Sequence, residues 1–340
     1  AGNPGEPDRG PAAGSGASAA HRVTLIDRQR ATNVAISLAK IKIPHQVLRG
    51  MLLSLQLRTT AADGTEYTLT QAVLDTVRMQ LPDKAEMEAV GGYKGPVHLL
   101  GEAEAFFAAV HDVPKLPARV KALHVWSQYP APFTEAQKKM AALQAASQEV
   151  VSSARLQRVL RLALQLGNVL NNTPGDVNGF SLESLALFER TKSFDGTTTA
   201  LQYVVTRLNA VDSDALRLEE DLKHVVAAGR IPTSTVATDL KALQEAVETC
   251  AALADGSSVA PLTTPPAPGS SVTTLAEFVR VAGDHFAALK ASHKGLASAL
   301  HVLVAFVGGD GSTTPDSVFH HLAAFLKDFT RAKARLVVEA

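Results

Sequence analysis

The sequence predicts an all-α fold with at most trivial β content. Hydrophobic residues make up 46% of the 340 residues, so the chain can bury a sizeable core. Over long stretches these residues recur with the i, i+3, i+4 spacing that places them on one face of a helix. Alternating apolar and polar runs, the pattern of a half-buried strand, are scarce. We therefore expect an elongated bundle of many helices.

Two segments interrupt the helical pattern. Residues 1–21 are rich in Gly, Ala, Pro and Ser and have few apolar residues, which is typical of a flexible tail. Residues 256–274 are rich in Pro, Ser and Thr, and we expect a loop there because helical patterning resumes on both sides. The folded core is expected to span residues 22–336.

Four amphipathic stripes carry the helical prediction along the chain. Each is a set of apolar residues three or four positions apart: Leu156, Val159, Leu160, Ala163 and Leu164; Val236, Leu240, Leu243 and Val247; Phe278, Ala282, Phe286 and Leu289; and Val318, Leu322, Phe325 and Phe329. Thr233 and Ser234 are candidate N-caps for the second helix. Pro315 is well placed in the first turn of the fourth, where a missing backbone N–H is tolerated.

Charge and cysteine content exclude several classes of protein. The 33 Lys and Arg residues balance the 33 Asp and Glu residues, whereas phosphate contacts with a nucleic acid need a basic excess. Cys250 is the only cysteine, so no intramolecular disulfide can form, and a reducing cytoplasm fits best. No stretch approaches the roughly 20 apolar residues of a membrane span. We expect a cytoplasmic protein with no nucleic-acid partner and no membrane span.

No catalytic or metal-binding constellation is apparent. The 11 histidines include no HExxH pattern, and the adjacent His320 and His321 point to different faces of a helix. The run 308–313 resembles a phosphate loop but lacks its lysine, so a helix–helix loop is expected. Glu102 and Glu104 are two residues apart and diverge on a helix. The residues thus indicate a helical interaction module with no enzymatic activity, metal or cofactor.

One stretch of the sequence carries a motif specific enough to compare with known protein families. Between Leu162 and Val204, the pattern L-x-x-G-N-x-h-N precedes a polar loop, G-F, L-x-x-L and T-K-S with an aspartate two residues on. The residues that carry this pattern are Leu164, Gly167, Asn168, Leu170, Asn171, Gly179, Phe180, Leu182, Leu185, Thr191, Lys192, Ser193 and Asp195. Their order and spacing resemble the signature of formin homology 2 domains.

Other segments extend this resemblance from about Leu25 to Ala334. The start of the family's knob region is matched by Leu25, Asp27, Arg30, Asn33 and Ile36, and its L-G-x-A-E-x-F pattern by Leu100, Gly101, Ala103, Glu104 and Phe106. The resemblance implies a knob region at about residues 22–130, followed by a coiled-coil and post region at 131–336.

The resemblance also implies a function. Formin homology 2 domains usually form a head-to-tail ring of two that nucleates actin filaments and stays at their barbed ends. It implies that Ile36 is an apolar actin contact and Lys192 a second contact, with Arg30 and Asn33 as further candidates in the knob. The alternatives are a core isoleucine, since Val34 and Leu38 share its apolar run, and an ordinary solvated lysine.

A second group of residues matches the post, the region that receives an N-terminal lasso from the partner subunit. These residues are Gly167, Asn168, Asn171, Gly179 and Phe180. Alternatively, Gly167 ends its helix as a C-cap and Asn168 adopts a left-handed conformation.

The sequence departs from the family pattern in two places. A Gly/Ala/Pro tail stands where the tryptophan-bearing lasso is expected, and the sole tryptophan, Trp126, lies mid-chain. Where the family commonly has D-T-K, this chain has Arg190, Thr191 and Lys192. Two hypotheses follow. The first is an actin-binding core that nucleates filaments and associates with barbed ends, with a homodimer implied by the family and profilin bound by a proline-rich segment outside this chain. The second is a formin-derived scaffold without processive elongation.

Overall fold

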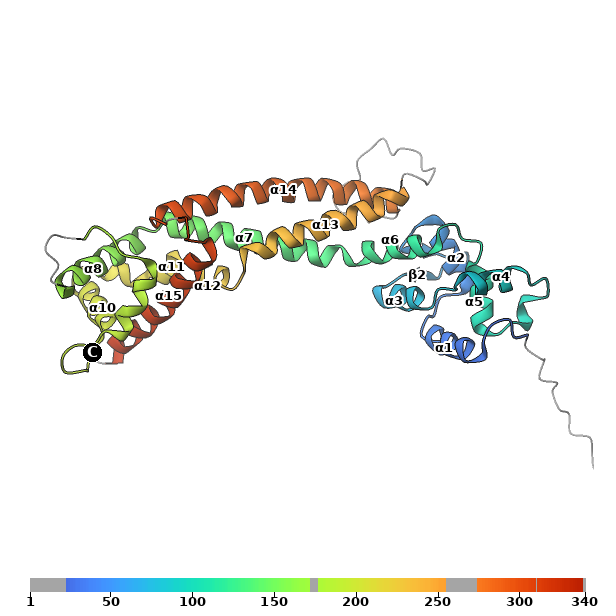
Figure 1. The fold of residues 1–340 in the computed structure, drawn as a ribbon, viewed down its shortest axis with the longest axis horizontal. Coiled ribbons are helices and arrows are strands. Elements are labelled where there is room, and N and C mark those ends of the chain that lie inside the picture. Colours follow the sequence, from blue (N-terminus) through green and yellow to red (C-terminus); the bar gives the residue numbers. More distant parts are fainter. Residues whose placement is uncertain (1–22, 172–176, 255–273, 310, 339–340) are drawn as a thin grey trace, which may run out of the picture. The chain divides into compact units, whose positions relative to one another are not determined.

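The computed structural model describes residues 23–171, 177–254, 274–309 and 311–338 (Figure 1). Apart from one two-stranded hairpin, the regular structure of these residues is helical, so the predicted all-α class is confirmed. The expected tail and most of the expected loop at 256–274 lie outside the described residues. The chain divides into two compact units, Ala1–His124 and Val125–Ala340, and each is described by itself.

The first unit consists of short helices and the hairpin. Its elements are α1 (Arg28–Leu38), α2 (His45–Ser54), β1 (Arg58–Thr60), β2 (Glu66–Thr68), α3 (Gln71–Met79), α4 (Lys84–Gly91), the 3-10 turn η1 (Val97–Leu99), α5 (Glu102–Val110) and most of α6 (Leu116–Gln128). The strands are antiparallel, with Thr59 opposite Tyr67.

Helix α5 forms the centre of the first unit. Its sequence is almost entirely apolar apart from two glutamates, and Phe106 and Phe107 are completely buried. Helices α1, α2 and α4 pack against it. Local signals set the ends of the neighbouring helices. The Asp27 side chain caps α1 by accepting from Arg30 N at 2.9 Å, and Asp83 and Glu86 form a capping box at the start of α4.

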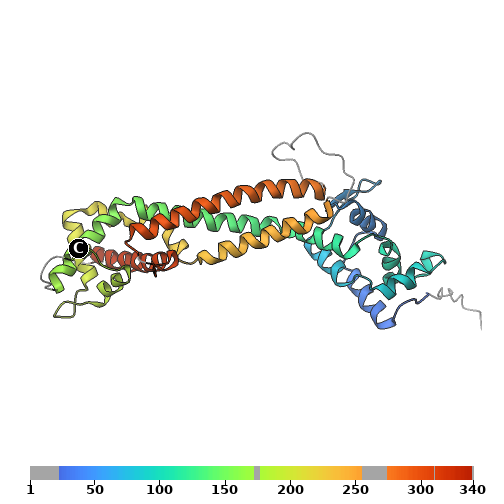
Figure 2. The ribbon, with the colours of Figure 1, turned by 45° about the horizontal axis from the view of Figure 1, so that its top comes forward.

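A three-helix bundle forms one part of the second unit. Helices α7 (Pro130–Ser152), α13 (Thr233–Ala254) and α14 (Leu275–Phe306) lie side by side (Figure 2). At one end Trp126 stacks on Phe278 with ring centroids 5.3 Å apart. The predicted N-caps of α13 are wrong, because Thr233 and Ser234 lie inside the helix. Instead, Thr233 N donates to the Asp316 carboxylate at 2.9 Å.

The other part of the second unit is a cluster of shorter helices around α15 (Pro315–Val338). It comprises α8 (Ala154–Asn171), η2 (Leu182–Ser184), α9 (Leu185–Arg190), α10 (Ala200–Val211), η3 (Ser213–Arg217), α11 (Leu218–Asp221) and α12 (Val225–Ala228). Pro315 begins α15, as predicted, and Phe319 and Phe329 are completely buried. At Gly229, which follows α12, an added Cβ would lie 3.1 Å from the Phe319 carbonyl oxygen, so α12 and α15 pack closely here and leave little room for a side chain.

A polar network fixes the bend between α7 and α8. Ser153 Oγ accepts from Leu156 N at 3.0 Å, which caps α8, and donates to the Asp221 carboxylate at 2.8 Å. Arg155 pairs with both Asp221 and Asp214. The side-chain hydrogen bonds from Arg155, Arg217 and Arg158 hold the pKa of Asp214 well below its usual range. This network orients α8, whose far end carries three of the predicted post residues, Gly167, Asn168 and Asn171.

No helix among the described residues has both the length and the apolar character that crossing a membrane would require.

Candidate protein-interaction sites

Ile36 lies on the exposed face of α1. Val34 and Leu38, one turn apart, are 0% and 4% exposed, whereas Ile36 between them is 63% exposed. A residue two positions from a buried residue points to the opposite side of a helix. The core alternative for Ile36 is therefore wrong, and an isolated isoleucine is presented to solvent.

Asn33 shares this exposed face. It lies about one turn before Ile36, and its Oδ1 accepts a hydrogen bond from Gln29 Nε2 at 3.3 Å. The exposed face of α1 thus combines amide groups with one large apolar side chain. Such a surface can make both directional and apolar contacts with another protein.

Arg30, in contrast, is partly buried and bonds to other residues of the first unit. Its guanidinium pairs with Glu86 at 3.0 Å, donates to Gln80 Oε1 at 3.0 Å and donates to the Leu81 carbonyl at 3.1 Å. It also lies over the Phe107 ring, 5.7 Å from the centroid. The structure therefore separates Arg30 from Asn33 and Ile36, and gives its cation an internal role in positioning α1.

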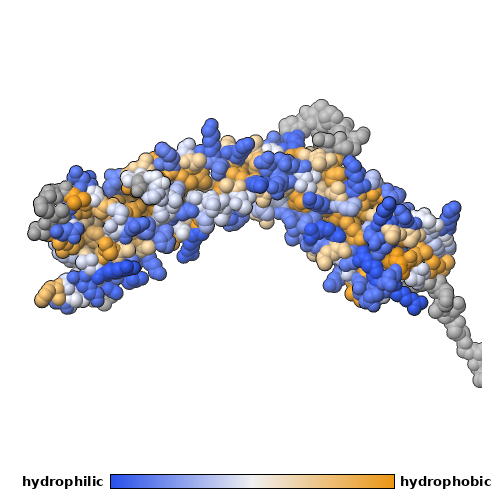
Figure 3. Space-filling view, viewed as in Figure 1, coloured by the Kyte–Doolittle hydropathy of each residue, from blue (hydrophilic) through white to orange (hydrophobic). Residues whose placement is uncertain are grey.

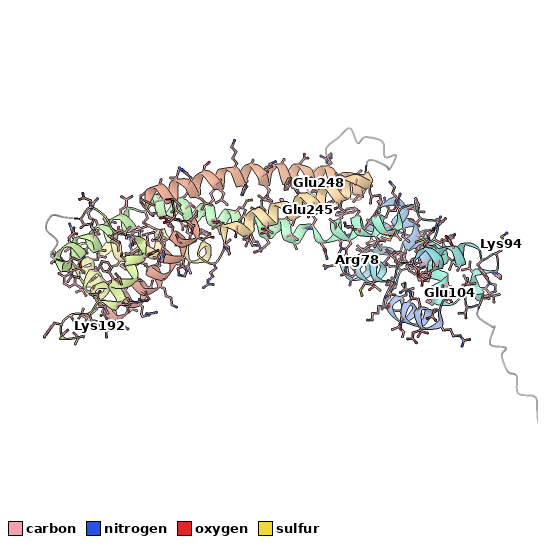
Figure 4. All side chains as sticks on the ribbon, viewed as in Figure 1. Arg78, Lys94, Glu104, Lys192, Glu245 and Glu248 are labelled. Carbon is pink, nitrogen blue, oxygen red and sulfur yellow. The ribbon has the colours of Figure 1, made fainter. Side chains whose placement is uncertain are left out.

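Lys192 belongs to a tight loop between α9 and α10. Backbone hydrogen bonds close the loop, from Ser193 N to the Thr198 carbonyl and from Ala200 N to the Thr191 carbonyl, both at 2.8 Å. Lys192 is exposed, and Figure 4 shows it on this projecting loop. In the described parts of the chain, no carboxylate lies within ion-pair distance of Lys192.

Asp195 holds this loop together. Its carboxylate accepts from Ser193 Oγ, from Thr197 Oγ1 at 2.8 Å and from Thr197 N at 3.1 Å. These bonds, the one from Ser193 first, lower the pKa of Asp195 to about 2. Gly196 adopts a φ of 72°, in the left-handed region that favours glycine. Ser193 and Asp195 of the sequence pattern thus have a structural role, which is to shape the loop that carries Lys192.

The five predicted post residues line one groove. It has a volume of about 430 Å³ and lies among α8, α9 and the segment that connects them. Gly167, Asn168 and Asn171 come from α8, and Gly179 and Phe180 from the connection. The C-cap alternative is wrong, because α8 continues through Gly167 and Asn168 to Asn171. Asn168 Nδ2 donates to the Val177 carbonyl at 3.0 Å and so ties the connection to the helix.

The walls of this groove also include apolar residues that the sequence did not mark as site residues; Leu170 among them belongs to the family pattern. Leu187 is 54% exposed, and the Phe188 ring lies 6.3 Å from that of Phe180. Val177 and Leu170 are 46% and 56% exposed. Hydrophobic surface is visible at this end of the second unit in Figure 3. The sequence of the short α9, LALFER, is rich in apolar residues, but this composition does not predict which of them line a groove.

The glycines of the groove are not required by packing within the chain. At both Gly167 and Gly179, an added Cβ would meet no atom within 4 Å. Glycine inside a helix costs roughly 1 kcal/mol relative to alanine. Gly167 therefore lowers the stability of α8 and leaves open space on the groove wall.

The fold is that of an all-helical module, whose surface carries an exposed isoleucine, a projecting loop with a lysine and a groove with apolar walls. Comparison with known proteins names its family: residues 5–330 match the Formin Homology 2 Domain. The chain belongs to this family, as the resemblance predicted. The family match begins at residue 5, whereas the motifs that carry the resemblance begin at Leu25.

Curated relatives agree with this assignment. The chain is 27% identical over 329 residues to "Formin-like protein 20" of Arabidopsis thaliana, covering 94% of this chain and 19% of that protein. It is 26% identical over 315 residues to "Formin-H" of Dictyostelium discoideum, covering 91% and 28%. With "Formin-like protein 6" of Oryza sativa subsp. japonica it shares 27% identity over 229 residues, covering 67% and 16%. The chain thus spans between about a sixth and a little over a quarter of these relatives.

Proposed function

We propose that this domain binds actin, nucleates actin filaments and associates with their barbed ends without enzymatic chemistry. The observation that carries the proposal is the exposure of Ile36, at 63%, at the position that matches the family's apolar contact. A large apolar side chain that becomes fully desolvated in an interface can dominate its binding energy. Asn33 contributes a polar contact beside it, and Arg30 acts indirectly by fixing α1.

Lys192 supplies the second contact in this proposal. Its loop is already ordered by hydrogen bonds, so little conformational entropy is lost when the ammonium meets an acidic surface. A positioned cation speeds association and fixes the register of a complex. Arg190, which is also exposed and precedes Lys192 by two residues, adds to the positive charge.

We further propose that the groove of the second unit receives an extended segment from a second copy of the protein, which gives the homodimer implied by the family. The open space beside Gly167 and Gly179 lets a partner backbone approach closely, and the exposed Leu170 and Leu187 offer apolar contact. Profilin binding through a proline-rich segment outside this chain, and a cytoplasmic location at the actin cytoskeleton, belong to the same proposal.

A fluorescence assay of actin assembly tests the role of Ile36. We expect Ile36→Ala to weaken the interaction with actin about tenfold or more, because it removes an apolar contact while disturbing no buried neighbour. Met79→Ala is a matched control, since Met79 is 72% exposed in the same unit and lies outside the proposed contact. Equal assembly curves for wild type and Ile36→Ala would contradict the contact. A wild-type domain without any effect on assembly would favour the scaffold hypothesis.

A further inference from the structure

Phe194 is the most exposed of the large hydrophobic residues that the structure describes. Its relative exposure is 111%, and it lies in the loop between α9 and α10 that also carries Lys192. Hydrophobic surface is visible at the end of this projecting loop in Figure 3. Single exposed apolar residues are normal on protein surfaces, so exposure alone assigns no role to Phe194.

The loop around Phe194 is held in one conformation. Ser193, directly before it, donates its N–H to the Thr198 carbonyl and its hydroxyl to Asp195. The Ser193 hydroxyl also accepts from Thr198 N at 3.1 Å, and Gly196 N donates to the Ser193 carbonyl at 2.9 Å. With the bonds from Thr197 to Asp195, these contacts tie together the residues on both sides of Phe194. The ring is therefore presented to solvent by an ordered loop.

Two exposed cations precede Phe194 in the chain, and one carboxylate, that of Asp195, directly follows it. Lys192 lies two residues before Phe194 and Arg190 four residues before it, and both are exposed. The nearest carboxylate in sequence, Asp195, is occupied by the hydroxyl and amide donors of the loop. A partner surface that complements this loop would hold an apolar socket with carboxylates at its edge.

We propose that Phe194 is the apolar anchor of the Lys192 contact, and that its ring inserts into an acid-rimmed apolar socket on actin. This inference rests on the proposed function and deepens it, because the second contact then combines charge with burial of a large ring. Since the loop is already ordered, binding costs little conformational entropy. An aromatic ring that becomes fully desolvated in a partner's pocket can then be an energetic hot spot.

A protein socket fits this loop better than a lipid surface. Stable attachment to a membrane takes two signals, such as two acyl chains or one chain with a polybasic cluster. One phenylalanine with two cations falls short of that requirement. The geometry, a single ring on a narrow and ordered loop, suits a pocket of matching shape.

Binding of the whole chain to actin filaments, measured over a range of salt concentrations, tests the inference. We expect Phe194→Ala to weaken binding about tenfold at every salt concentration and to leave the salt dependence unchanged, because no charge is lost. Phe194→Leu should retain most of the affinity. Lys192→Ala should instead reduce the salt dependence. Val211→Ala, at a residue that is 67% exposed at the end of α10, is the matched control and should bind like wild type.

Thermal unfolding should be unchanged in Phe194→Ala, because the exposed ring supports no packing. Wild-type affinity in Phe194→Ala, with weaker binding in Ile36→Ala and Lys192→Ala, would overturn the inference and leave the proposed function intact. Failure of the wild-type chain to bind actin would overturn both. Phe194-dependent binding to phosphatidylserine vesicles, or Phe194-dependent self-association in sedimentation, would also overturn it by assigning the ring to a lipid or to a second copy.

Discussion

Gly167 shows how a single residue can be unfavourable for the fold and favourable for a site. It lies inside α8, where glycine lowers helix stability. Apart from its chain neighbours and the nearby backbone of its own helix, no atom of the chain lies within 4 Å of where its Cβ would be. Gly229 offers the opposite case, since an added Cβ there would lie 3.1 Å from both Ala323 Cβ and the Phe319 carbonyl oxygen. Gly229 lies in close internal packing, whereas Gly167 leaves room in the groove.

This contrast gives a prediction about stability. Gly167→Ala should raise the free energy of unfolding by about 0.5–1 kcal/mol, because alanine has the higher helix propensity and its methyl group meets nothing. Gly229→Ala should lower it, because the new methyl group strains the packing of α12 on α15. Urea unfolding of the two variants measures both effects. A loss of stability in Gly167→Ala would show that the chain itself needs this glycine.

Ile36 and Phe194 differ in how far the sequence could identify them. The family pattern marks Ile36, but periodicity alone could not separate it from the buried Val34 and Leu38 in the same apolar run. The family pattern does not specify the residue at position 194. The proposed role of Phe194 depends on the geometry of the loop, which the pattern does not give. Exposure of a single side chain is a tertiary property, so both assignments needed the structure.

At the scale of elements, the loop between α9 and α10 depends on one ionised carboxylate. Hydrogen bonds lower the pKa of Asp195 to about 2, compared with about 3.9 in an unfolded chain. Because the folded pKa is the lower one, this stabilisation is fully present above about pH 4 and is lost as the pH falls toward 2.

We therefore expect the amides of Thr197 and Thr198 to keep their protection from hydrogen exchange down to about pH 4 and to lose it progressively as the pH falls toward 2. Asp195→Asn should reduce this protection already at neutral pH, because a neutral amide oxygen is a weaker acceptor than a carboxylate. NMR hydrogen exchange measures both effects. Unchanged protection in Asp195→Asn would show that the backbone bonds alone hold the loop.

The elements themselves were predictable where the signal was local. The four apolar stripes fall on α8, α13, α14 and α15, and Pro315 begins α15. The predictions that failed depended on partners distant in the sequence. The Asp316 carboxylate accepts a hydrogen bond from Thr233 N, although the two residues are 83 positions apart. The sequence around either residue does not predict that contact. The groove is likewise made from α8, α9 and their connection, so its walls could not be read from any one segment.

At the scale of the whole molecule, the proposed contacts belong to both units. Ile36 belongs to the first unit, whereas Lys192 and the groove belong to the second. Each unit supplies a local scaffold for its site: the buried α5 and the Arg30 contacts position α1, and the Asp195 bonds shape the loop. We propose that both contacts bind the same end of an actin filament.

Binding of the domain to short actin filaments, with barbed ends either open or blocked by a capping protein, tests this claim most directly. We expect binding to filaments with open ends and loss of binding when the ends are blocked. We also expect Ile36→Ala and Lys192→Ala each to weaken binding, and the double variant to weaken it further than either alone. Equal binding to open and blocked filaments, or wild-type affinity in the double variant, would rule out a shared binding site at the filament end.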